Sequence, residues 1–172
     1  TLADISVLRG LSDAQTFSEL LKESDAWQEE HESQGQSIMG KSMLPHDIGE
    51  LMKWEHTNIC TDGGFEGHPR GYGAFPRFLS YFVKGMSLMS LEEAIRHATS
   101  LAAHNMGLKD RGEIKVGAYA DLILFNEDTI KDNASLENRS AISDGLKMVW
   151  VNGQLALNQG QATHHYSGKV IK

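Results

Sequence analysis

The stretch CTDGGFEGHPRGYG, residues 60–73, places aspartate, glutamate, histidine and arginine side chains among five glycines. A carboxylate such as Asp62 can take a proton from water or bind a metal ion. An arginine such as Arg70 can hold a carboxylate through two parallel hydrogen bonds. The glycines would let the backbone approach a ligand closely, but they match neither G-x-G-x-x-G nor a P-loop with its lysine. The stretch therefore indicates a binding or catalytic loop without a phosphate motif.

The same residues also have a plain structural interpretation. Asp62–Gly63 is typical of a turn that ends a strand, because aspartate and glycine are common at such positions. Arg70, taken alone, could be an ordinary surface arginine. The residue types by themselves leave both interpretations open.

Metal ligation by this chain has little support in its histidine spacing. The sequence contains neither H-x-H nor H-E-x-x-H, which place two imidazoles on one metal ion. It also lacks the elbow motif of a Ser-His-Asp hydrolase, and Cys60 is expected to point into a sheet as a small hydrophobe. Asp62 is the one candidate metal ligand. We interpret most other histidines as structural or solvated: His31, His46, His97, His104, His164 and His165.

The segments before the loop would position Asp62. Residues 37–43 (SIMGKSM) and 56–63 (HTNICTDG) are strand-like, and a short helix opens between them at Pro45. A strand, a helix and a strand at this spacing form a β/α unit and predict parallel pairing. Active sites of such folds gather where the strands end, which is where Asp62 lies.

Helices are predicted on both sides of this unit. Ser12 and Ser90 each begin a capping box, S-x-x-Q and S-x-x-E, so each opens a helix. An aromatic helix is expected at 75–84, and the helix from Ser90 should end at Gly107, since glycine favours the C-terminal cap. Its inward face is expected to carry Leu91, Ala94, Ile95, Ala98, Leu101 and Ala102.

Beyond residue 108 the pattern changes from helical to strand-like. Asn152–Gly153 is typical of a hairpin turn, so the tail is expected to form an antiparallel β layer. We therefore predict two domains, 1–108 and 109–172. The expected strands are 120–125, 147–151 and 154–157.

Composition excludes several classes of protein. With 172 residues and 40% hydrophobic content, the chain can bury one sizeable core or two small ones. A net charge of −7 without a basic cluster argues against binding nucleic acid. The longest uncharged apolar stretch is 78–83, far too short for a membrane span. A single cysteine fits a reducing compartment, so we expect a cytoplasmic protein.

Three segments resemble a known family. HATSLAAHNMGLKDRGEIKVGAYADLILF (97–125) resembles the closing segment of the metal-dependent amidohydrolase superfamily, and KMVWVNGQLALNQGQAT (147–163) resembles its returning sandwich strands. NICTDGGFEGHPRGYGAFPRFL (58–79) is similar to the N-acyl-D-amino-acid deacylase (D-aminoacylase) branch. The resemblance implies an α/β fold, namely the C-terminal part of a (β/α)8 barrel followed by part of a β-sandwich.

The resemblance also implies roles for the loop residues. Asp62 would be the general base and acid, which takes a proton from metal-activated water and passes it to the leaving amine. Arg70 would bind the substrate carboxylate, while His68 and Tyr72 would shape the substrate loop. Structural roles in the passage to the sandwich are implied for Gly112, Gly117, Ala120 and Asp121.

The departures from the family matter equally. The H-x-H of the first barrel strand and the later metal ligands are absent, and a closed barrel takes about 250 residues. We therefore expect the C-terminal portion of a zinc-dependent enzyme that hydrolyses N-acyl-D-amino acids, inactive in isolation. Its partners would be the small-molecule substrate, the remainder of the same polypeptide and further copies of itself in a homo-oligomer. The alternatives are a cyclic-amide hydrolase of the hydantoinase or dihydropyrimidinase kind, or a non-catalytic module that self-associates through unpaired strand edges.

Overall fold

A computed structural model describes residues 1–31, 43–63 and 68–171 of the chain. The chain divides by its internal contacts into two compact units, Thr1–Ser42 and Met43–Lys172. Both predicted domains, 1–108 and 109–172, include part of the second unit, and the boundary near residue 108 stays a prediction. Of the expected strand 37–43, all but Met43 lies outside the described residues.

The first unit is a pair of helices. Helix α1 (Leu2–Arg9) begins at a capping box formed by Thr1 and Asp4. Helix α2 (Asp13–His31) follows Ser12, whose hydroxyl accepts from the backbone N–H of Gln15 while the Gln15 side chain accepts from the backbone N–H of Ser12. The predicted capping box is thus confirmed, because both partners are local in sequence.

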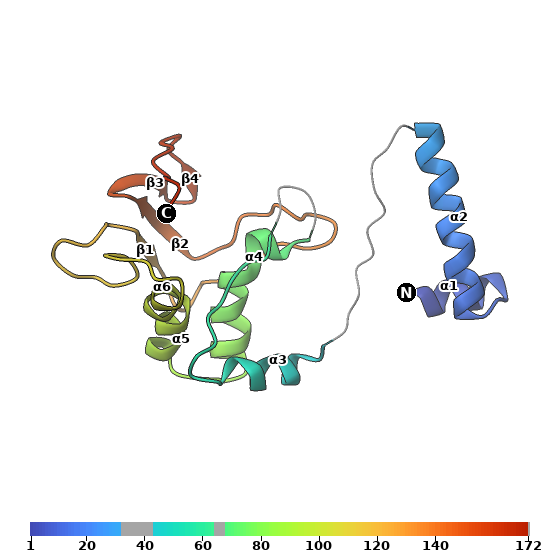
Figure 1. Ribbon diagram of the computed structural model, residues 1–172, viewed down its shortest axis with the longest axis horizontal. Helices are drawn as coiled ribbons and strands as arrows, with labels where there is room; N and C mark the ends of the chain where they lie inside the picture. Colours follow the sequence, from blue (N-terminus) through green and yellow to red (C-terminus); the bar gives the residue numbers. More distant parts are fainter. Residues whose placement is uncertain (32–42, 64–67, 172) are drawn as a thin grey trace. The chain divides into compact units, whose positions relative to one another are not determined.

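The helical part of the second unit is drawn in teal, green and yellow in Figure 1. Its core contains Phe78, Phe82, Val83 and Ala94, so the aromatic helix packs against the helix that Ser90 opens. The helices are α3 (Pro45–Met52), α4 (Arg70–Arg77), η1 (Phe78–Gly85), α5 (Leu91–Ala98) and α6 (Ser100–Asn105). None of the helices within the described residues is long and apolar enough to cross a membrane.

The aromatic helix is not a regular α-helix. Pro76 lies inside α4, and a proline has no N–H with which to continue the helical ladder. After Arg77 the backbone continues as the π-helix η1, a form that is rare as a whole element. Figure 1 shows α4 running directly into η1, so the predicted helix at 75–84 exists in a mixed geometry.

The helix that opens at Ser90 is interrupted once. Ser90 caps it as predicted, since its hydroxyl accepts from the backbone N–H of Glu93 at 3.2 Å. At Thr99 the backbone leaves the helical region, with φ −132° and ψ −88°, and the Thr99 hydroxyl donates to the carbonyl of Ile95 at 2.6 Å. A threonine hydroxyl that bonds back to the preceding turn competes with the helical ladder. Gly107, at φ 68°, ends the second piece as predicted.

The tail forms the antiparallel sheet that was expected. Its strands are β1 (Leu122–Phe125), β2 (Leu146–Val151), β3 (Gln154–Asn158) and β4 (Gln161–Ala162), in the order β1-β2-β3-β4. Asn152 and Gly153, at φ 48° and 79°, form the predicted hairpin turn.

Asp121 joins the two strands at one end of the β1–β2 ladder. Its Oδ1 accepts from the backbone N–H of Asn152 at 2.7 Å, and Arg111 pairs with its Oδ2. Arg111 also donates to the Asn152 side chain. Asp121 therefore fastens the start of β1 to the β2–β3 turn, which agrees with the structural role implied for it.

The prediction of a strand at 56–63 is wrong. Residues 57–63 adopt no strand, and Cys60 is exposed and free instead of pointing into a sheet. A strand needs a paired neighbour to satisfy its backbone N–H and C=O groups. Among the described residues, strand pairing occurs only in the tail, so the parallel β/α unit is not formed there.

Candidate functional site

Asp62 follows α3, in a segment (57–63) that adopts neither helix nor strand. Its backbone has φ 45°, in the left-handed region that non-glycine residues seldom adopt but aspartate tolerates better than most. A Cβ on Gly63 would lie 2.4 Å from the Cα of Gly71, in the first turn of α4. The two glycines therefore let the backbone that carries Asp62 lie directly against the start of that helix.

Arg70, the first residue of α4, is bound to Asp62 by two contacts. Its Nη2 lies 2.7 Å from the Asp62 carboxylate oxygen Oδ2, and its Nε donates to the Asp62 backbone carbonyl at 2.9 Å. The two side chains are 48% and 77% exposed, respectively. The two residues expected from the sequence as proton carrier and carboxylate clamp are thus in direct contact, across eight positions of the chain.

His68 lies next to this pair. Its Nδ1 accepts a hydrogen bond from the backbone N–H of Arg70 at 3.2 Å. This assigns the proton of the neutral imidazole to Nε2, because Nδ1 must be the acceptor. His68 thus supports the first turn of α4, consistent with a role in shaping the loop. Tyr72 is half exposed on the same turn, and its role remains a prediction.

The described residues do not make a zinc site by themselves. Across residues 1–31, 43–63 and 68–171, no group of three or more His, Cys, Asp or Glu side chains is placed to hold a metal ion. Asp62 as a single metal ligand therefore remains a prediction. Any zinc bound beside it would need ligands from outside this described part.

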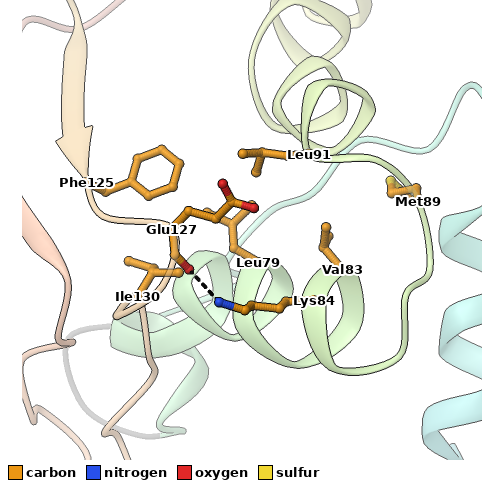
Figure 2. A pocket seen from close by; sticks show the side chains of 8 residues that line it. All are labelled: Leu79, Val83, Lys84, Met89, Leu91, Phe125, Glu127 and Ile130. Atoms are coloured by element: carbon orange, nitrogen blue, oxygen red, sulfur yellow. Dashed lines mark hydrogen bonds between the residues drawn. The ribbon is translucent and has the colours of Figure 1, made fainter.

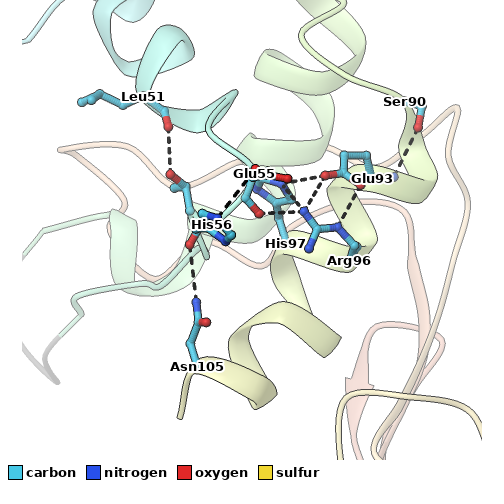
Figure 3. Close-up of polar contacts among 9 residues, drawn as sticks. Leu51, Glu55, His56, Ser90, Glu93, Arg96, His97 and Asn105 are labelled. Atoms are coloured by element: carbon cyan, nitrogen blue, oxygen red, sulfur yellow. Dashed lines mark hydrogen bonds and ion pairs between the residues drawn. The ribbon is translucent and has the colours of Figure 1, made fainter.

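A second polar network holds the segment that leads to Asp62 (Figure 3). Glu93 on α5 pairs with Arg96 through two hydrogen bonds of 2.9 and 2.7 Å. Arg96 then donates to the backbone carbonyl of Glu55 at 2.7 Å, across 41 positions of the chain. The buried His97 places its Nε2 3.0 Å from the Glu93 carboxylate. Hydrogen bonding to Arg96 chiefly, followed by that to His97, lowers the pKa of Glu93 to about 2.

Asn105 on α6 fastens the next residues of the same segment. Its amide donates to the Asn58 side chain at 3.0 Å and to the His56 backbone carbonyl at 3.4 Å. Thr57 donates back to Leu51 of α3. Sequence reasoning missed this network, because its decisive contacts join residues more than 40 positions apart. The sequence contains only one sign of this network. Glu93, Arg96 and His97 have the i, i+3, i+4 spacing that places side chains on one helix face.

A small cavity lies elsewhere in the second unit (Figure 2). It has a volume of about 120 Å³ and an apolar lining, apart from Glu127 and Lys84. Lys84 donates to Glu127's backbone carbonyl and pairs with Asp128. None of Asp62, His68 and Arg70 lines it. The lining residues are Leu79, Val83, Lys84, Met89, Leu91, Phe125, Glu127 and Ile130.

Curated relatives resemble this chain over most of its length. It is 32% identical over 128 residues to a D-aminoacylase of Alcaligenes xylosoxydans xylosoxydans, which covers 73% of this chain and 26% of that protein. It is 37% identical over 134 residues to an N-acyl-D-glutamate deacylase of the same organism, covering 76% and 27%. The chain thus spans about a quarter of the length of these relatives.

Solved structures agree with the sequence comparison. A crystal structure of a D-aminoacylase matches with a TM-score of 0.80 and 30% identity over 98% of this chain and 34% of that one. An N-acyl-D-glutamate deacylase from Bordetella bronchiseptica, complexed with zinc and a phosphonate inhibitor, matches with a TM-score of 0.70 and 26% identity over 92% of this chain. Residues 2–156 of this chain match the amidohydrolase family. This chain belongs to the amidohydrolase family.

Proposed function

We propose that this chain is the C-terminal portion of an enzyme that hydrolyses the amide bond of N-acyl-D-amino acids to a carboxylate and a D-amino acid. Residues 1–108 would complete the end of a (β/α)8 barrel, and residues 109–172 would belong to its β-sandwich. The similar proteins named D-aminoacylase and N-acyl-D-glutamate deacylase support this reaction. The remainder of the polypeptide would supply the rest of the barrel.

The observation that carries the proposal is the contact between Asp62 and Arg70. Besides the metal-bound water, the reaction needs two groups. One is a carboxylate that accepts and returns a proton, and the other is a guanidinium that binds the substrate's carboxylate. Both are exposed, so a substrate can reach them. In this assignment Asp62 takes the proton of the attacking water and gives it to the leaving nitrogen, while Arg70 orients the free carboxylate of the amino acid.

Zinc would be the cofactor of the complete enzyme, as in the zinc-bound relative. Bound zinc makes water acidic enough to act as a nucleophile near neutral pH. Because the described residues form no cluster of three metal ligands, its ligands would lie mainly outside those residues.

The test is a substrate panel on the complete polypeptide that contains this chain. We expect release of D-amino acids from N-acetyl-D-amino acids and little or none from the L-enantiomers. Hydantoin and dihydropyrimidine rings, the substrates of the alternative cyclic-amide hydrolase, should not be opened. Ring opening without deacylation would replace the proposal with that alternative, and no hydrolysis of either kind would favour a non-catalytic module.

A further inference from the structure

Asp62 and Arg70 cannot both do their proposed work while they hold each other. The Nε–Nη2 edge of the guanidinium is already used, with Nη2 on the Asp62 carboxylate and Nε on the Asp62 backbone carbonyl. A planar guanidinium binds one carboxylate through two parallel hydrogen bonds along one edge. A substrate carboxylate that takes this edge must therefore displace Asp62.

Resting on the proposed function above, we propose that the substrate's carboxylate releases Asp62 for catalysis by taking its place on Arg70. In the empty site Arg70 holds the Asp62 carboxylate toward the first turn of α4. When a substrate with a free carboxylate binds, that group replaces Asp62, and the freed Asp62 side chain turns to the amide. Arg70 thus determines specificity through turnover as well as through binding.

The exchange is energetically easy. The side chains of Arg70 and Asp62 are 48% and 77% exposed, and ion pairs at such exposure contribute little net stability. One carboxylate replaces another on the same guanidinium, so the charge that Arg70 faces does not change. The backbone of the site stays in place, because Gly63 still packs on Gly71 and His68 still accepts from the backbone of Arg70.

The proposal predicts that one substitution acts in opposite directions on two substrates. For an N-acetyl-D-amino acid, Arg70→Met removes the clamp and should raise KM and lower kcat/KM. For the matching N-acetyl-D-amino acid carboxamide, which has no carboxylate to displace Asp62, the wild-type enzyme should turn over slowly. Arg70→Met should raise kcat for this carboxamide about two- to five-fold, because it frees Asp62 from a weak, exposed pair.

Acetate release from both substrates is measured on the complete, zinc-loaded polypeptide, and zinc content is checked in every variant. Lys53→Met is the matched control, because it breaks another exposed ion pair of 2.7 Å, between Lys53 and Glu50, that none of the site residues joins. It should change neither substrate's kinetics. A loss of folding in Arg70→Met would lower kcat for both substrates, and cannot produce a rise for one.

Opposite changes in the two substrates would support the exchange. If a folded, zinc-loaded Arg70→Met enzyme leaves kcat for the carboxamide unchanged or lowers it, Arg70 does not restrain Asp62 in the empty site and the exchange is wrong, although the deacylase function stands. If the wild-type polypeptide deacylates neither substrate, the proposed function fails and this inference fails with it.

Discussion

At the scale of single residues, the proposed chemistry of this chain rests on Asp62, His68 and Arg70. Asp62 is held at an unusual backbone angle, and Arg70 begins a helix whose first turn His68 supports. The residue types pointed to this loop, and the family resemblance gave each residue its role. The contact between Asp62 and Arg70 could not be predicted, because residue spacing does not say which way a side chain turns in a glycine-rich loop.

Asp62→Asn should reduce turnover by roughly 10²- to 10⁴-fold in the complete polypeptide, because an amide of the same shape cannot accept and return the proton. Zinc content should stay near that of the wild type. Asparagine tolerates positive φ, so the backbone at φ 45° should not be disturbed. Steady-state kinetics with an N-acetyl-D-amino acid, together with elemental analysis, would measure both quantities.

Asp110→Asn is the control for this experiment. Asp110 is also an exposed aspartate at positive φ, 56°, but it lies outside the site. It should leave turnover unchanged. Near-wild-type turnover in Asp62→Asn would remove Asp62 from the mechanism, and a parallel loss of zinc would make it a metal ligand instead of a proton carrier.

At the scale of elements, the features that were predicted correctly depend on neighbours in sequence. The capping residues Ser12 and Ser90 and the turn Asn152–Gly153 needed only local hydrogen bonds, and all three are confirmed. The strand at 56–63 failed because a strand depends on a partner elsewhere in the chain. The segment is held instead by side chains of α5 and α6, chiefly Arg96 and Asn105.

The close packing of Gly63 on Gly71 makes a steric prediction. Gly63→Ala would place a Cβ 2.4 Å from a backbone atom, so the Asp62 segment must move away from α4. We expect a loss of stability of about 1–3 kcal/mol, the range typical of overpacking, together with lower turnover. Gly168→Ala is the matched control, since nothing lies within 4 Å of its Cβ. Thermal unfolding of both variants measures the difference, and equal melting temperatures would contradict the packing.

The network around Glu93 predicts a pH dependence of stability. Its pKa falls from the ordinary value of 4.5 to about 2 in the folded chain, mainly through Arg96. A depressed pKa means that the unfolded state binds the proton first, so this contribution is fully present above about pH 4.5 and is lost as pH falls toward 2. Glu93→Gln should therefore be less stable than the wild type at pH 6, with the difference shrinking below pH 4. Denaturant unfolding at several pH values measures it, and a constant difference would place the contribution elsewhere.

At the scale of the whole molecule, the chain would supply only part of the proposed site. It spans about a quarter of its curated relatives, and its described residues contain the proposed proton carrier and clamp without a cluster of metal ligands. By themselves these two residues are chemically ordinary. Asp62 and Arg70 form an exposed ion pair of a kind that contributes little to the stability of the fold. The proposed chemistry arises only when a nucleophile and a substrate are bound next to Asp62 and Arg70.

Metal content tests whether this chain holds zinc by itself or only as part of the complete polypeptide. The purified and dialysed 172-residue chain should retain far less than one zinc ion per molecule, because the described residues place no cluster of ligands beside Asp62 and one carboxylate binds zinc weakly. The complete polypeptide should retain zinc after the same dialysis, which controls for the procedure. Elemental analysis per molecule measures both. Tightly held, stoichiometric zinc in the 172-residue chain would mean that its own side chains form a metal site, and the deacylase proposal would then have to place zinc within this chain.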